Sequence, residues 1–266
     1  MTHSLRYTVN CSLLFTELPV TERPAAAVAA GFDAVEFWWP WTTAVPAAAE
    51  VDAFVAAIDS SGAALTGLNF FAGALPGPDR GVLSLPARAE EFRANIDVVL
   101  DIAERTGVRA FNALYGLRQD GVDPAEQDRV ALAEITAAAK AVAGIGGTVL
   151  IEPISGAPDY PLTTAEDALA VVDAAKGNGA DNVALLADFF HLAVNGADVA
   201  AVVDAHAAEF GHIQIADAPG RGEPGTGELP LDALLTAAQQ QGYDGYVGLE
   251  YKPTVPSADS FAWLGR

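Results

Sequence analysis

Short apolar runs alternate with longer Ala-rich stretches along the whole chain. The short runs are rich in β-branched and aromatic residues and predict strands at residues 7–13, 34–39, 64–70, 109–114, 148–154, 183–189, 211–217 and 246–251. The Ala-rich stretches predict helices near residues 21–30, 46–60, 88–106, 124–143, 163–175, 197–209 and 230–241, with a short last helix near 257–264. Alternation of strand and helix is typical of an α/β fold.

Two of these helices begin with recognisable capping residues. Asp123 precedes Pro124, which suits the first helical position, and Glu126 follows in the first turn. Thr163 and Glu166 have the spacing of a capping box. We therefore expect helices to begin beside Asp123 and Thr163.

Eight strand and helix units in 266 residues match the size of a (β/α)8 barrel. We predict one TIM-barrel domain over residues 1–266. A doubly wound sheet is the alternative, but it usually has a Gly-rich phosphate turn after its first strand, and residues 10–19 (NCSLLFTELP) contain none. The long irregular segment at residues 72–86 follows the third strand, where barrel loops surround the active site, and is a candidate lid.

Polar side chains stand at or near the C-terminal ends of the later predicted strands. They are Glu152, Asp188 with His191 close behind, His212, Gln214 and Glu250. Buried carboxylates that converge without a cation repel one another, so a bound metal ion resolves the pattern. Carboxylate and amide oxygens suit Mg²⁺ or Mn²⁺ more than Zn²⁺. The structural alternatives are a helix-capping or ion-paired role for the carboxylates and, for His212, a hydrogen-bonded place in the core, which we favour.

The first four predicted strands repeat the pattern with Asn10, Glu36, Asn69 and Asn112. We count Glu36 and Asn69 as candidate substrate contacts, with hydrogen-bonded structure as the alternative. The aromatic residues Trp38, Trp39 and Trp41 are interpreted first as packing, and second as an apolar wall of the pocket.

Charge and composition exclude several partners. The chain carries 35 acidic and 14 basic residues, a net charge of -21 that opposes nucleic acid and anionic membranes. Its single cysteine allows no intrachain disulfide, and its start lacks the apolar region of a signal peptide. No apolar run reaches the ~18 residues of a membrane span. We expect a cytoplasmic protein with no nucleic-acid or membrane partner.

Four of the scarce cations, hereafter the rim cations, fall after predicted strands: Arg80, Arg118, Arg221 and Lys252. In so acidic a chain they favour recognition of a small carboxylate. The alternative is that rim loops contain some basic residues without such a role.

Seven segments resemble, in order and spacing, the hydroxypyruvate isomerase family of xylose isomerase-like TIM barrels. They are NCSLLFTELP, GFDAVEFWWP, RGVLSLPARAEEFR, LIEPIS, DFFH, GHIQIADAPGRGEPGTGE and GYDGYVGLEYKP. The resemblance covers nearly the whole chain, although Ser155 stands where family members often have Asn. It implies a metal-dependent isomerase of glyoxylate metabolism that interconverts hydroxypyruvate and 2-hydroxy-3-oxopropanoate (tartronate semialdehyde).

The same resemblance implies roles for individual residues. Glu152 and Glu250 would be the paired catalytic glutamates and metal ligands, Asp188 and Gln214 would complete the metal shell, and His191 and Arg221 would face the substrate, a small 2-oxo or hydroxy acid. Lys252, on the same strand face as Glu250, joins the substrate-binding candidates as a rim cation. The chemistry agrees, because moving a carbonyl from C2 to C3 requires a base, an acid and a stabilised enediolate.

Other functions remain open on the same barrel. A 2-oxo-tetronate isomerase or a ketose 3-epimerase would use the same metal site, and a catalytically inactive barrel would bind a small acid without proton exchange. An endonuclease IV-like phosphodiesterase is disfavoured by the negative charge and by only four histidines. The sequence fixes neither the metal nor the number of subunits, so a homo-oligomer stays open.

Overall fold

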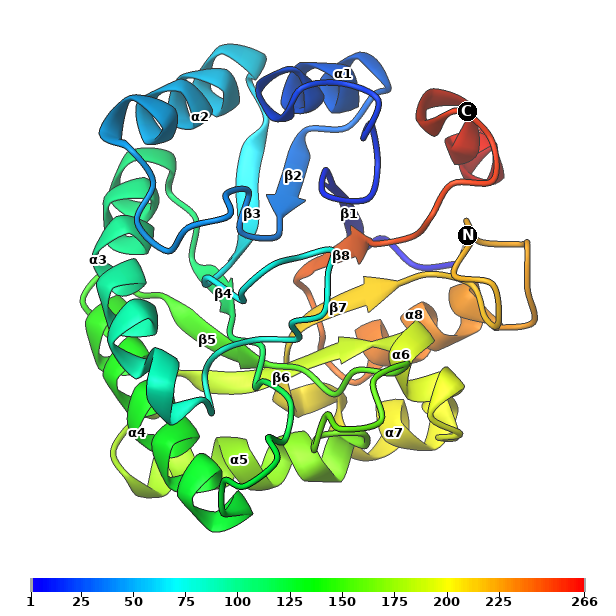
Figure 1. Ribbon diagram of the computed structural model, residues 1–266. Helices are drawn as coiled ribbons and strands as arrows, with labels where there is room; N and C mark the ends of the chain where they lie inside the picture. The colour runs from blue at the N-terminus through cyan, green and yellow to red at the C-terminus, as the bar shows by residue number, and fades with distance from the viewer. Residues whose placement is uncertain (1, 266) are drawn as a thin grey trace.

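The computed structural model describes residues 2–265 and shows a closed barrel of eight parallel strands, in which β8 pairs with β1 (Figure 1). The strands are β1 (Arg6–Asn10), β2 (Ala34–Phe37), β3 (Ala64–Asn69), β4 (Ala110–Asn112), β5 (Thr148–Ile151), β6 (Val183–Asp188), β7 (Phe210–Ile215) and β8 (Tyr246–Leu249). The predicted (β/α)8 barrel is confirmed. A doubly wound sheet is excluded because the sheet closes on itself.

Helices surround the barrel and bury the outer face of its strands (Figure 1). The α-helices are α1 (Arg23–Ala29), α2 (Ala48–Ser61), α3 (Ala89–Thr106), α4 (Pro124–Ala143), α5 (Ala165–Gly177), α6 (Phe189–Val194), α7 (Val199–His206) and α8 (Leu231–Gln240). Four short 3₁₀ helices are η1 (Val20–Glu22), η2 (Pro86–Arg88), η3 (Ala207–Glu209) and η4 (Ser257–Leu264). The sequence did not predict α6, and the expected helix at 197–209 consists of α7 followed by η3.

The two expected caps differ in outcome. Asp123 caps α4 as predicted, since its carboxylate accepts a hydrogen bond of 3.0 Å from Ala125 N. The prediction of Thr163 with Glu166 at α5 is wrong by one residue. Thr164 caps this helix, its hydroxyl accepting from Asp167 N at 3.1 Å. The Asp167 carboxylate accepts in return from the peptide N–H of Thr163 and of Thr164, which sets the helix start at the later residue.

Two glycines in the strands make room for a carboxylate inside the barrel. A Cβ atom at Gly248 would lie 2.6 Å from Glu36 Oε1, and one at Gly67 would lie 3.2 Å from Glu36 Cβ. Any larger residue at Gly248 would therefore displace the Glu36 side chain. These two strand glycines leave space for the Glu36 side chain inside the barrel.

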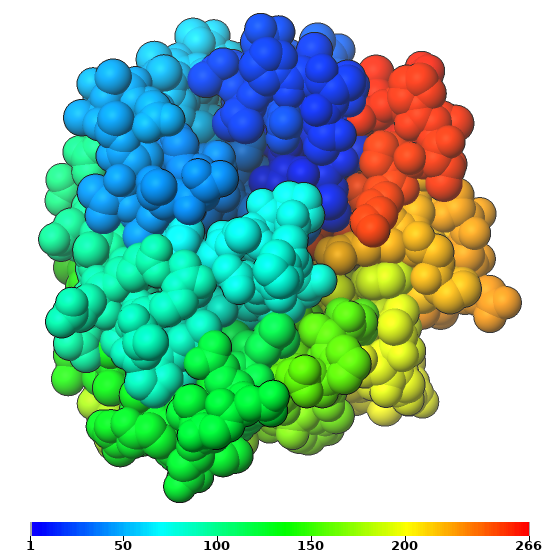
Figure 2. All heavy atoms as spheres, viewed as in Figure 1, coloured from blue at the N-terminus to red at the C-terminus, as the bar shows by residue number. Residues whose placement is uncertain are grey.

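The segment at residues 72–86 crosses in front of the strands (cyan in Figure 1), and its atoms fill the centre of this face in Figure 2. It is hydrogen-bonded to the segment after β4, with Ser84 N donating to Tyr115 O at 2.8 Å and Gly116 N donating to Arg80 O at 3.0 Å. Leu75, Pro76, Gly77 and Arg80 of this segment line the cavity at the strand ends, as its place after the third strand suggested, whereas a role as a lid stays a prediction. Among residues 2–265, no helix has the length and apolarity to cross a membrane.

Candidate active site

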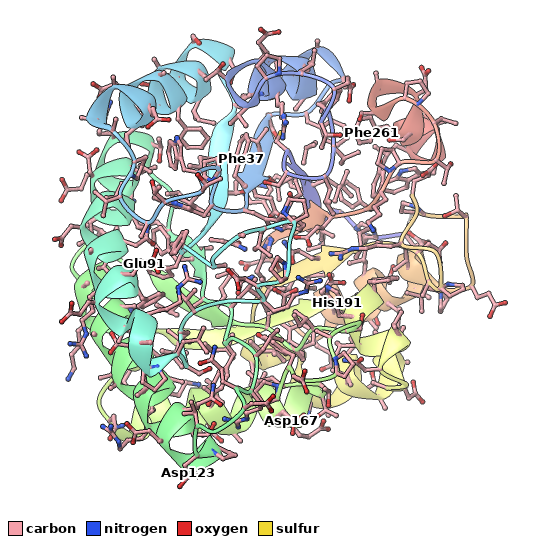
Figure 3. All side chains as sticks on the ribbon, in the orientation of Figure 1. Phe37, Glu91, Asp123, Asp167, His191 and Phe261 are labelled. Carbon is pink, nitrogen blue, oxygen red and sulfur yellow. The ribbon has the colours of Figure 1, made fainter. Side chains whose placement is uncertain are left out.

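A cavity of about 210 Å³ lies at the C-terminal ends of the strands. Six of the sequence-predicted site residues line it: Asn69, Glu152, His191, Arg221, Glu250 and Lys252. Figure 3 shows His191 near the centre of this face, whereas the helix-capping residues Asp123 and Asp167 lie at the periphery. The structure thus brings together side chains from strands that are far apart in the sequence.

Glu152 follows β5 and is buried. Its Oε2 atom accepts a hydrogen bond of 2.7 Å from Asn112 Nδ2, at the end of β4, and its Oε1 atom lies 3.9 Å from His191 Nε2. Burial, and then the negative charge of Asp188, raise the pKa of Glu152 to about 8. A carboxyl group with such a pKa can both hold and release a proton near neutral pH.

Asp188 is the last residue of β6, and its two carboxylate oxygens have different surroundings. Its Oδ1 atom caps α6 by accepting from the peptide N–H groups of Phe190 at 2.8 Å and His191 at 3.3 Å. Its Oδ2 atom is buried and has no hydrogen-bond partner among the described residues. That oxygen lies 3.6 Å from His191 Nε2 and 3.8 Å from Arg221 NH2. A buried carboxylate oxygen without a partner suits a cation.

Gln214, on β7, has an amide orientation that its neighbours dictate. Its Nε2 atom donates to Glu36 Oε1 at 2.7 Å and also to Glu250 Oε2. Only the N–H side of an amide can face two carboxylates, so its Oε1 atom points elsewhere. This oxygen is buried and without a hydrogen-bond partner within residues 2–265. It is a second orphaned acceptor in the same region.

Glu250 follows β8 and is surrounded by donors. Arg221 NH2 lies 2.6 Å from Glu250 Oε1, and Asn10 Nδ2 donates to Glu250 Oε2 at 2.8 Å. Burial raises the pKa of Glu250 well above its usual range, while the Arg221 charge acts in the opposite direction. The Arg221 backbone occupies the left-handed region, with φ of 60°. Such a conformation is uncommon outside glycine and here accompanies a functional candidate.

His191 stands in the first turn of α6 and is buried. Burial lowers its pKa to about 4, and the charge of Asp188 opposes this shift while Arg221 and Arg80 add to it. The ring is therefore neutral at physiological pH. It offers one donor and one acceptor nitrogen.

The donor set fits a divalent metal ion. Ligand atoms of Glu152, Asp188 and His191 all lie within 4.8 Å of one another. The sequence predicted Gln214 and Glu250 with the same two carboxylates, and the orphaned Gln214 oxygen supports that set. Both sets share Glu152 and Asp188. They differ in that the first set contains the imidazole of His191, whereas the second contains the Gln214 amide oxygen and Glu250 in its place.

Glu36 and His212 lie outside the cavity lining, beneath Gln214. Glu36 Oε1 accepts from Asn10 Nδ2 at 3.0 Å, and Glu36 Oε2 lies 2.7 Å from His212 Nε2. Glu36 was expected to contact substrate, but both of its oxygens are occupied by protein groups. His212 is a hydrogen-bonded histidine in the barrel interior, as interpreted from the sequence. Asn112, which was not among the chosen site residues, is the one that holds Glu152.

The rim cations divide into two groups. Arg80, Arg221 and Lys252 line the cavity. Arg118 does not, because its side chain pairs with Asp128 at 2.7 Å and donates to Pro124 O at 3.1 Å. Arg221 is paired with Glu250, whereas Arg80 donates to the backbone carbonyls of Gly77 and Asp79. Within residues 2–265, neither Arg80 nor Lys252 forms an ion pair with an acidic side chain.

The tryptophans also differ in position. Trp38 lines the cavity, as its second interpretation required. Trp39 packs on Trp41 with ring centroids 4.8 Å apart, and Trp41 packs on Phe54 at 5.4 Å. Trp39 and Trp41 thus stabilise the segment after β2 by aromatic packing.

Known proteins resemble this chain over nearly its full length. The family described as xylose isomerase-like TIM barrel matches residues 24–266. A Streptomyces coelicolor protein named "Putative hydroxypyruvate isomerase" is 56% identical, covering 97% of this chain and 95% of its own. A 2-oxo-tetronate isomerase of Cupriavidus necator is 35% identical, with 97% of both chains covered. A hydroxypyruvate isomerase of Escherichia coli is 30% identical, with 98% of both covered.

Solved structures agree on the fold. A Brucella melitensis protein described as AP endonuclease, family 2, aligns with a TM-score of 0.87 at 28% identity, covering 98% of both chains. The Escherichia coli 3-keto-D-glucoside 4-epimerase aligns with a TM-score of 0.77 at 20% identity, covering 99% of both. At that identity the likeness to the epimerase concerns the fold alone.

Proposed function

Because the chain belongs to the hydroxypyruvate isomerase family of xylose isomerase-like TIM barrels, we propose that it interconverts hydroxypyruvate and 2-hydroxy-3-oxopropanoate with a divalent metal ion. The resemblance seen in the sequence motifs is confirmed by these relatives. The observation that carries the proposal is a pair of buried carboxyl groups, Glu152 and Glu250, that line one cavity and have raised pKa values.

These two glutamates supply the proton transfers. One carboxylate removes a proton from C3 of hydroxypyruvate, the proton of the C3 hydroxyl passes to the C2 oxygen, and a carboxyl group returns a proton to C2, which leaves a carbonyl at C3 and a hydroxyl at C2. Burial raises the pKa of both groups, and the charge of Glu152 raises that of Glu250 further. In the proposed reaction one of the two groups acts as the base and the other as the acid.

The metal ligands in this proposal are Glu152, Asp188, Gln214 and Glu250. The orphaned oxygens of Asp188 and Gln214 support this set, because each is a buried acceptor without a protein donor in the described part of the chain. Oxygen ligands favour Mg²⁺ or Mn²⁺. When bound, such an ion supplies positive charge that stabilises the enediolate.

The acid group of the substrate is assigned to the two unpaired cations of the cavity lining, Arg80 and Lys252. Both cations line the cavity, and neither is neutralised by an acidic side chain within residues 2–265. A substrate carboxylate would neutralise these two cations and accept charge-assisted hydrogen bonds from them. This favours a 2-oxo acid over a neutral ketose. Asn69 and His191 are proposed as further substrate contacts from their place in the lining.

A 2-oxo-tetronate isomerase is the second candidate. The Cupriavidus necator relative of that name is 35% identical over nearly the full chain, and its reaction would use the same enediolate between C2 and C3. The cavity of about 210 Å³ accommodates acids of either three or four carbons. A cytoplasmic location and a place in glyoxylate metabolism remain predictions.

A turnover screen tests the proposal. Chelated protein is supplied with Mg²⁺ or Mn²⁺ and assayed with hydroxypyruvate, 2-oxo-tetronate and a neutral ketose such as D-fructose. We expect turnover of a 2-oxo acid that depends on the added metal. Turnover of the ketose alone would identify an epimerase, and binding of the acids without turnover would identify an inactive barrel.

A further inference from the structure

The imidazole of His191 is held at one ring nitrogen by a single neighbouring residue. The peptide N–H of Ser155 donates to His191 Nδ1 at 3.0 Å, and the Ser155 hydroxyl lies 2.7 Å from the same nitrogen. A peptide N–H only donates, so Nδ1 must present its lone pair. The proton of the neutral ring is then on Nε2, and the Ser155 hydroxyl donates as well.

The other ring nitrogen faces acceptors. His191 Nε2 lies 3.6 Å from Asp188 Oδ2 and 3.9 Å from Glu152 Oε1. An N–H group at Nε2 is attracted to the Asp188 oxygen, whereas a lone pair there would be repelled by it. Both sides of the ring therefore favour the same tautomer.

The loop that carries Ser155 is hydrogen-bonded to the end of the helix that carries His191. Asn195, which follows α6, donates its side-chain amide to Ile154 O at 3.2 Å and to Thr163 O at 2.8 Å. Ile154 N in turn donates to Leu162 O at 3.2 Å. These bonds keep the Ser155 peptide in place against the imidazole.

We propose that Ser155 is a positioning residue that fixes His191 as its Nε2–H tautomer, so that the ring presents a donor to the cavity and no lone pair to a metal ion. The hydrogen bond from Nε2–H would go to an oxygen of the bound 2-oxo acid or its enediolate, and this identification of the acceptor rests on the proposed function. The tautomer also decides between the two alternative sets of metal ligands. A nitrogen that keeps its proton does not ligate a metal, which leaves Gln214 and Glu250 to accompany Glu152 and Asp188.

Nitrogen-15 NMR of the full-length, metal-free protein labelled at histidine reads the tautomer directly. The variant His191→Gln identifies the signals of His191 among the four histidines. We expect a directly bonded proton on Nε2 and none on Nδ1, before and after saturation with Mg²⁺. A proton on Nδ1, or loss of the Nε2 proton when Mg²⁺ is added, would overturn the proposal.

Two variants at position 155 distinguish the effect of the Ser155 peptide N–H on the tautomer from that of its hydroxyl. Ser155→Ala keeps the peptide N–H and is the matched control, so the proton stays on Nε2. Ser155→Pro lacks the N–H, and we expect signals from both tautomers. An unchanged Nε2–H signal in folded Ser155→Pro would overturn the role of Ser155.

If Ser155→Pro does not fold, the wild-type spectra with and without Mg²⁺ still decide the tautomer. None of these measurements uses turnover. Absence of activity on 2-oxo acids would reject the proposed function without changing the NMR result.

Discussion

The side-chain amide of Gln214 donates a hydrogen bond of 2.7 Å to Glu36 Oε1, although the two residues are 178 positions apart in the chain. The same nitrogen also donates to Glu250, so carboxylates face it on both sides. The amide oxygen is then left without a partner among the described residues. Glu36 thus acts on the proposed metal site without lining the cavity.

Replacing Glu36 should weaken metal binding. In Glu36→Gln, the new side chain offers both a donor and an acceptor, so that Gln214 can turn its amide either way. Groups that orient metal ligands typically contribute about 10–100-fold to affinity, and we expect the dissociation constant for Mn²⁺ to rise by that factor. Isothermal titration calorimetry on chelated protein measures it.

The control for this variant is Glu134→Gln on α4. Glu134 is also buried, but it pairs with Arg93 and does not line the site cavity. Its loss should lower stability and leave Mn²⁺ affinity unchanged. Equal Mn²⁺ affinities in wild type and Glu36→Gln would show that Glu36 does not orient the ligand.

Arg80→Met should weaken substrate binding more than it slows the chemical step. A hydrogen bond to a charged group contributes roughly 1.5–3 kcal/mol, so we expect KM for the 2-oxo acid to rise at least about tenfold, with a smaller change in kcat. Steady-state kinetics at saturating Mg²⁺ measures both constants.

Arg118→Met provides the matched control, because Arg118 is a rim cation that pairs with Asp128 outside the cavity lining. Its KM should match that of the wild type. Equal effects of the two substitutions would mean that Arg80 makes no special contact with the acid group.

The metal-free protein should lose stability as pH rises from about 5 to 8. The pKa of Glu152 is raised to about 8 in the folded state from an ordinary value of 4.5, chiefly by burial and then by Asp188. Between these values the folded protein binds more protons than the unfolded chain, so the contribution of Glu152 is present below pH 4.5 and is lost as pH approaches 8. Glu250 acts in the same direction.

Urea unfolding of chelated protein at several pH values measures this dependence. Glu152→Gln cannot titrate at this position, so the stability of the wild type relative to this variant should fall steadily with pH. A relative stability that rises over the same range would show that the folded state favours the ionised form of Glu152.

The strands and their polar ends could be predicted because both follow from local patterns. Alternating apolar residues indicate strands, and in a parallel barrel all C-terminal strand ends meet at one face. Glu152, Glu250 and His191 were identified in this way and line the cavity. The unexpected helix α6 has a local signal too, since Asp188 caps it, but the sequence suggested only a ligand role for that residue.

Other features depend on contacts that no local pattern reveals. Arg80 and Arg118 both follow strands, yet Asp128 on α4 draws Arg118 to a different site. The partnership of Glu36 with Gln214 requires the barrel to close, because it joins β2 to β7 across its interior. The sequence indicates a polar residue at each position without indicating its partner.

The central claim is proton transfer by Glu152 and Glu250 on a 2-oxo acid, and proton NMR of hydroxypyruvate in deuterated water with Mg²⁺ tests it most directly. We predict that the C3 protons of hydroxypyruvate exchange for deuterium as product forms, that chelation stops both processes, and that Glu152→Gln and Glu250→Gln each slow them by at least about 100-fold. Turnover and exchange at near-normal rates in both variants would contradict the account.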